Sequence, residues 1–160
     1  MMDSDTAIFC EIALNHRGQI RPMLYRNPLS RAVQSYHKKF GGNVDMRVYG
    51  FTEMKQGIME VENSLKAEQA FVGGYIEVYC ISDKLDVVCN DEGKINGLEL
   101  RVAHIEDKRI LEVIAGDCFV CRHNDEGEFV SIEDEDLEVI KEKLKPVVFT
   151  IGNRVFVRED

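Results

Sequence analysis

The sequence predicts an α+β protein in which a mostly antiparallel or mixed sheet is accompanied by about three helices. Apolar residues recur at helical spacing in a few segments, while alternating or short apolar runs fill most of the others. The connections between the expected strands are too short for helical crossovers, which favours antiparallel pairing. With 44% hydrophobic and 31% charged residues among 160, the chain has the composition of a protein with a packed core.

The beginning of the chain predicts a hairpin followed by a helix. Residues 7–14 and 20–25 have the composition of two strands, and Gly18 can close the turn between them. A helix is expected over residues 28–40, because Asn27-Pro28 supplies a cap and a first-turn proline and apolar residues follow at helical spacing.

A strand and a second helix are expected next. Residues 44–51 alternate apolar and polar side chains, which is the period of a half-buried strand. The second helix is expected to begin near Thr52, and Gly57 would cost it about 1 kcal/mol relative to alanine. Its apolar stripe consists of Met54, Ile58, Val61 and Leu65.

From Phe71 onward the sequence predicts strands separated by glycines and polar turns. A third helix is expected between Ser131, its predicted cap, and Pro146, with acidic residues in its first turn and lysines in its last. The expected strands of this half cover residues 75–81, 85–89, 98–102, 109–114, 118–122, 128–131, 147–151 and 154–157.

The length of the chain fits one compact domain over residues 1–160, since domains typically have roughly 100 to 200 residues. The change in composition near residue 70 also allows two lobes. They would be an N-terminal α/β lobe over 1–70 and a β-rich C-terminal lobe over 71–160 that ends in a helix and a hairpin.

Charge and cysteine content limit the classes of partner and compartment. The formal net charge of −9 makes direct nucleic-acid binding unexpected, because such binding depends on Lys and Arg contacts to phosphates. No apolar run is long enough to cross a membrane, and the N-terminal residues lack the pattern of a signal peptide. An odd number of cysteines, five, indicates reduced thiols. We therefore expect an acidic cytoplasmic protein whose partner is another protein; the oligomeric state is not predicted.

Three segments of the second half carry a resemblance to a known family: Val72-Gly73-Gly74-Tyr75-Ile76-Glu77-Val78, Val88-Cys89-Asn90-Asp91-Glu92-Gly93-Lys94-Ile95-Asn96-Gly97-Leu98 and Val113-Ile114-Ala115-Gly116-Asp117. We refer to them as the first, second and third family segments. Over roughly residues 71–132 they resemble an uncharacterised bacterial and phage family, domain of unknown function 3846. Its members recur in phages and conjugative elements of Gram-positive bacteria. The resemblance implies a mobile-element setting and no mechanism.

Cys118 and Cys121 form a CxxC motif, which in other settings binds zinc or exchanges disulfides. Here the motif falls in an expected strand, where residues three apart point to opposite faces. It lacks a second ligand pair and a helix N-terminus. We therefore expect buried structural cysteines, and we predict no metal site and no cofactor.

Four polar residues are the candidates for a binding site: Glu77, Asn90, Asp91 and Glu92. One predicted hairpin carries all of them, and paired carboxylates can bind a divalent cation or divide acid and base roles. The alternative is structural, because Asn-Asp-Glu-Gly suits a tight turn that ends in a left-handed glycine.

The sequence favours a non-enzymatic protein over an enzyme, since it contains no recognisable catalytic motif and we predict no catalytic residue. The preferred hypothesis is a binding or regulatory accessory protein of a phage or conjugative element that acts through protein–protein contacts. One alternative is a small metal- or small-molecule-binding enzyme that uses the carboxylates of the 75–93 hairpin. The other is an acidic protein that mimics nucleic acid and inhibits a host defence enzyme.

Overall fold

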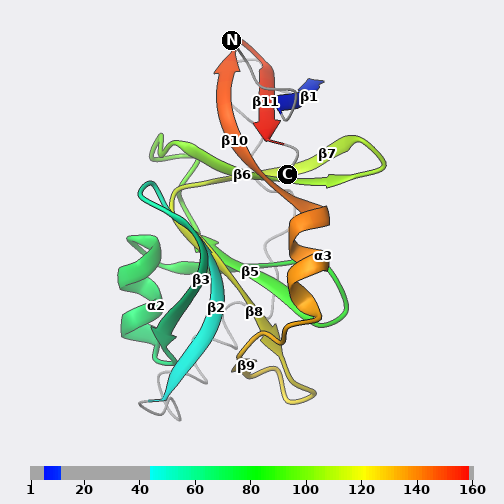
Figure 1. Cartoon of the computed structure of the whole chain (residues 1–160). Helices are drawn as coiled ribbons and strands as arrows, with labels where there is room; N and C mark the ends of the chain where they lie inside the picture. Colours follow the sequence, from blue (N-terminus) through cyan, green and yellow to red (C-terminus); the bar gives the residue numbers. More distant parts are fainter. Residues whose placement is uncertain (1–5, 12–43, 159–160) are drawn as a thin grey trace.

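The computed structural model describes residues 6–11 and 44–158, shown as ribbons in Figure 1. Within these residues the chain forms two antiparallel sheets and two helices. The elements in chain order are β1 (Thr6–Glu11), β2 (Asp45–Phe51), β3 (Gln56–Glu62), α2 (Leu65–Val72), β4 (Ile76–Cys80), β5 (Leu85–Asn90), β6 (Leu100–Glu106), β7 (Arg109–Ala115), β8 (Cys118–His123), β9 (Phe129–Val130), α3 (Asp136–Lys143), β10 (Leu144–Ile151) and β11 (Arg154–Arg158).

The six-stranded sheet has the order β3-β2-β8-β5-β4, and the short β9 pairs with β8. Its strand pairs are all antiparallel. Strands β2 and β3 precede residue 71, whereas the other strands of this sheet follow it. The sheet therefore takes strands from both sides of the suggested lobe boundary, and the division of the chain into lobes stays a prediction.

The five-stranded sheet has the order β1-β11-β10-β6-β7. β10 follows directly on α3 and first pairs with β6, where Pro146 lies opposite Val102. It then continues into the hairpin with β11 (Figure 1). Ala103, Val113 and Val155 belong to a separate core cluster within this sheet.

The six-stranded sheet is covered on both faces, with α2 and α3 on opposite sides of it (Figure 1). We call its two sides the α2 face and the inner face. Val88 and Phe119 pack with residues of α2, whereas their neighbours Val87 and Val120 pack with residues of α3 and of β6 and β7. This division follows from the period of two along a strand, which sends successive side chains to opposite faces.

The prediction of a second helix from Thr52 is wrong. Residues 56–62 form β3, which pairs with β2 from Asp45↔Glu62 to Phe51↔Gln56, and α2 begins only at Leu65 after its cap Ser64. The expected stripe is not buried as one face, because the Met54 side chain is 89% exposed. Residues 56–62 instead alternate in burial, as a half-buried edge strand does.

The third helix is confirmed, although its predicted cap is wrong. α3 covers Asp136–Lys143, and its N-cap residue Glu135 makes no side-chain capping bond. The hydroxyl of Ser131 accepts a hydrogen bond from the Arg47 amide instead. An Asp136 carboxylate oxygen accepts from the Glu133 amide and so satisfies one donor ahead of the helix.

The strands predicted after Phe71 can be compared with the structure, whereas two elements predicted before residue 44 cannot. Most strands expected after Phe71 are present within a few residues of their predicted bounds, and the sheets are antiparallel as favoured. The helix expected over 28–40 and the returning strand over 20–25 lie outside the described residues. Neither described helix is long and apolar enough to span a membrane.

Candidate functional site

The four residues nominated from the sequence do not gather on one face of the sheet. Glu77 lies opposite Cys89 in the β4–β5 pair, and Asn90 lies opposite Ile76, one position away. Successive residues of a strand point to opposite faces, so Glu77 is directed to the inner face and Asn90 to the α2 face. Both are buried, whereas Glu92 is exposed in the turn after β5.

Asn90 fastens the second family segment to the first. Its side-chain nitrogen donates to the Val72 carbonyl at 3.0 Å, and its side-chain oxygen accepts from the Glu92 amide at 2.8 Å. The Asp91 amide donates to the Tyr75 carbonyl at 2.9 Å. The side chain of Asn90 therefore holds a turn of the kind that short polar residues stabilise.

The third family segment is locked against the second by two close approaches. A Cβ atom at Gly93 would lie 2.7 Å from the Ala115 carbonyl oxygen, and one at Gly116 would lie 2.7 Å from Cδ1 of Leu98. Gly116 also has a φ of +82°, which disfavours other residues. The glycines thus allow the second and third family segments to pack directly against each other.

The three family segments meet around one hollow of about 530 Å³. We call it the family hollow. Each segment contributes to its wall: Val72 and Gly73 from the first, Asn90, Asn96, Gly97 and Leu98 from the second, and Gly116 and Asp117 from the third. The other lining residues are Glu53, Ala70, Phe71, Glu99 and Arg101. Of the four nominated residues, Asn90 alone lines this hollow.

Acidic side chains outnumber basic ones in the family hollow, with Glu53, Glu99 and Asp117 against Arg101. The Arg101 Nη2 atom lies 3.3 Å from an Asp117 oxygen, and Nη1 lies 3.6 Å from a Glu99 oxygen. The same Asp117 oxygen accepts a hydrogen bond from the Glu53 amide at 3.1 Å. The local field therefore favours a cationic group on any molecule that enters.

A second polar constellation lies between the two sheets. The Tyr79 hydroxyl lies 2.6 Å from Nδ1 of His104, and His104 Nε2 lies 3.2 Å from Oε1 of Glu106. Lys143 donates to the same Glu106 oxygen at 2.7 Å. Burial lowers the pKa of His104, and burial together with Glu112 and Glu106 raises the pKa of Tyr79 to about 12. The neutral forms of the His104 ring and of the Tyr79 hydroxyl are therefore favoured.

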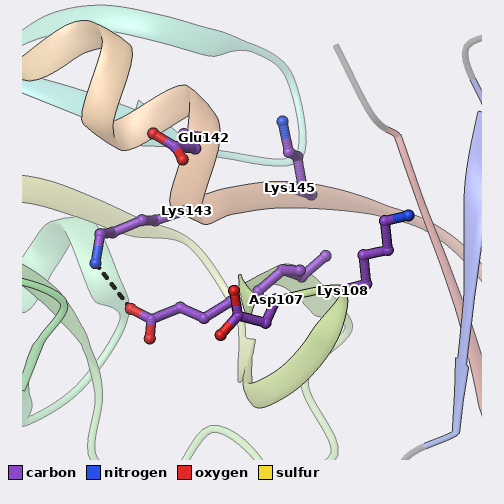
Figure 2. A pocket seen from close by; sticks show the side chains of 7 residues that line it. Asp107, Lys108, Glu142, Lys143 and Lys145 are labelled. Atoms are coloured by element: carbon purple, nitrogen blue, oxygen red, sulfur yellow. Dashed lines mark hydrogen bonds and ion pairs between the residues drawn. The ribbon is translucent and has the colours of Figure 1, made fainter.

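Glu106 and Lys143, at the outer end of this series of hydrogen bonds, line a second hollow of about 550 Å³ (Figure 2). The dashed line in Figure 2 is the pair between Lys143 and Glu106, while Lys108 and Lys145 extend on the other side. Glu106, Asp107 and Glu142 balance the three lysines in number. The charge of this hollow therefore favours neither a cation nor an anion.

The two cysteines of the motif are buried and point to opposite faces of their strand, as expected. Cys118 belongs to the core cluster of the inner face and Cys121 to that of the α2 face, and both are buried free thiols. Burial raises the pKa of each thiol, which makes the thiolate unfavourable. Among the described residues, no three or more His, Cys, Asp or Glu side chains are grouped so that they could hold a metal ion.

The model of a family described as a domain of unknown function (DUF3846) matches residues 46–145. The chain belongs to this family. The DUF3846 match is wider than the resemblance over 71–132, since it adds β2 from its second residue, β3, most of α2, and α3, and so reaches every strand of the six-stranded sheet. No curated protein and no solved structure matched the chain.

Proposed function

We propose that this DUF3846 protein is a non-enzymatic binding protein, an accessory of a phage or conjugative element, and that it acts through contacts with another protein at the family hollow. The observation that carries the proposal is the convergence of three separate family segments on the walls of one hollow. Their mutual packing fixes the shape of that wall before any partner arrives. A preformed surface of this kind lowers the entropy cost of association.

The rim of the hollow supports a protein partner. Leu98 lines the hollow and is 38% exposed, and Met54, which follows the lining residue Glu53 in the sequence, is 89% exposed. A partner protein at the hollow would remove apolar surface of these two residues from water, which favours association.

The charge of the hollow supports a basic segment as the part of the partner that enters. Glu53, Glu99 and Asp117 line the hollow together with a single arginine, and the whole chain carries a net charge of −9. Complementary charge accelerates encounter and selects among partners.

Site-specific photocrosslinking tests this proposal. The full chain would carry a photoreactive phenylalanine analogue at Leu98, or at Ile151 as the control, an exposed residue of β10 outside the hollow. We expect a specific protein adduct from position 98 and none from position 151 in cells that carry the element. The adduct would be identified and its protein purified for direct binding measurements.

Reversing the charge of two lining residues then tests whether the identified partner binds at the hollow. Changing Glu53→Lys and Glu99→Lys together should weaken binding of the purified partner about tenfold or more at low salt. An affinity that does not change, or equal adducts from both positions, would show that the partner binds elsewhere.

A further inference from the structure

Arg101 enters the family hollow because β6 is irregular at this residue. Leu100 lies opposite Ala115 and Val102 lies opposite Ile114, so Arg101 is an extra residue on β6. An inserted residue of this kind leaves the ladder unpaired locally and redirects a side chain. Here it places a guanidinium among the residues that line the hollow.

The guanidinium of Arg101 is held in place, yet it makes no hydrogen bond within the described part of the chain. Its side chain is only 18% exposed, and its contacts with Asp117 and Glu99 are ion pairs at 3.3 and 3.6 Å. The Nε atom is buried without an acceptor among these residues. An arginine carries five N–H donors, and the exposed part of this side chain can offer donors to an acceptor that enters the hollow.

The acceptor that fits this position is neutral. Three carboxylates line the hollow with Arg101, so a carboxylate or phosphate ligand would be repelled. A peptide carbonyl offers the same oxygen acceptor without a charge, and it leaves the carboxylates available for a cationic side chain. Glu99 can move to meet such a side chain, since its own is 76% exposed, whereas Asp117 is fixed by the Glu53 amide.

We propose that the family hollow binds an extended basic peptide, and that Arg101 is its specificity-determining residue. The guanidinium donates to a backbone carbonyl of the peptide, and Glu99 and Asp117 accept an adjacent Lys or Arg side chain. This inference rests on the proposed function, because it specifies which part of a partner enters the hollow.

Peptide binding by the purified full chain tests the inference. The probe is a library of acetylated and amidated nonapeptides with Lys, Arg, Glu or Ala at a fixed central position, and affinities are measured by fluorescence anisotropy. We expect selection of Lys or Arg. Arg101→Lys keeps the charge but loses the planar fork, so it should weaken the best peptide about tenfold. Arg109→Lys, on an exposed residue of β7, is the matched control and should change affinity less than about twofold.

A backbone change in the peptide identifies the carbonyl. Replacing one amide by an ester weakens its carbonyl as an acceptor, so at the contacted position the ester should weaken binding to the wild-type chain but not to Arg101→Lys. Unchanged thermal unfolding of Arg101→Lys would show that the variant is folded.

The outcomes separate this inference from the proposed function. Selection of Glu or Ala, or full affinity of Arg101→Lys for the selected peptide, would overturn the inference while a crosslinked partner at Leu98 would still support the proposed function. If no peptide binds and crosslinking at Leu98 yields no partner, both are wrong.

Discussion

Two buried ionisable side chains, Glu68 at the α2 face and His104 at the inner face of the six-stranded sheet, have different surroundings. On the α2 face, Glu68 points from the helix into an apolar cluster, and burial raises its pKa to about 8. On the inner face, His104 is part of a hydrogen-bonded chain that ends at the surface pair of Glu106 and Lys143. The α2 face therefore buries an acid whose neutral form is favoured, whereas at the inner face a buried histidine is held neutral within a hydrogen-bonded chain.

This difference gives the two faces opposite dependences on pH. The pKa of Glu68 is above its ordinary value of 4.5, so its contribution to stability is present below that pH and is lost as the pH rises towards 8. The pKa of His104 is below its ordinary value of 6.5, so its contribution is present above that pH and is lost as the pH falls. Four changes test the comparison.

The largest effect is expected from Arg122→Ala on the inner face. Arg122 donates to both carboxylate oxygens of Asp136, at 2.6 and 3.1 Å, and so ties β8 to α3. The Asp136 side chain is only 6% exposed, so the variant would leave a buried carboxylate without its cation. We expect a loss of about 3 to 5 kcal/mol in the free energy of unfolding, measured with urea at neutral pH.

The control for Arg122 is Asp134→Ala, which removes an ion pair at the surface. Arg47 and Asp134 pair at 2.8 Å, but the Asp134 side chain is 88% exposed. Its loss should cost less than about 1 kcal/mol. Similar costs for the two variants would mean that the inner face does not depend on its buried pair.

Glu68→Gln should produce the second effect, on the α2 face. Glutamine resembles the neutral carboxyl group and cannot ionise, so the variant should gain stability relative to the wild type as the pH rises from about 5 to 8. One pKa unit corresponds to about 1.4 kcal/mol, so a change from 4.5 to about 8 predicts a gain of a few kcal/mol. Urea unfolding at several pH values measures it.

Glu60→Gln on β3 is the control for Glu68, because its side chain is exposed. We expect its stability to follow the wild type at each pH. A difference between Glu68→Gln and the wild type that stays constant from pH 5 to 8 would show that Glu68 is ionised throughout, contrary to the comparison of the faces.

Elements that depend on local sequence patterns were predicted correctly, whereas an element that depends on contacts between distant residues was not. The strands after Phe71 and the charged ends of α3 follow from local patterns, so the sequence identified them. Met54, Ile58, Val61 and Leu65 fit a helical stripe, but Met59 and Val61 also fit an alternating strand. Pairing of β3 with β2 decided between the two periods, and that pairing is a tertiary contact.

The candidate site was less predictable than the fold. Asn90 was identified because Asn-Asp-Glu-Gly is a local turn pattern, and its side chain indeed holds that turn. Arg101 gave no signal, since it reaches the family hollow through an irregularity in β6. Tyr79 and His104 meet only because two sheets pack together. Such contacts depend on register and packing, which local periodicity does not specify.

The smallest effect is expected from His104→Asn on the inner face. In the neutral ring, Nδ1 accepts from the Tyr79 hydroxyl while Nε2 donates to Glu106, so protonation of Nδ1 would replace an acceptor by a second donor. The wild type should therefore lose stability relative to His104→Asn as the pH falls below 6.5, by less than the change expected for Glu68. Urea unfolding at pH 5 and pH 7 measures this difference.

Tyr79→Phe separates the hydrogen bond from burial as the cause of the His104 effect. Without the hydroxyl donor, the neutral ring loses a partner while the apolar packing of the aromatic ring is kept, so the pKa of His104 should rise towards its ordinary value. Titration of the His104 ring protons by NMR in both proteins measures that shift. If the two titration curves coincide, the Tyr79 hydrogen bond does not contribute to the pKa of His104, and this bond does not distinguish the inner face from the α2 face.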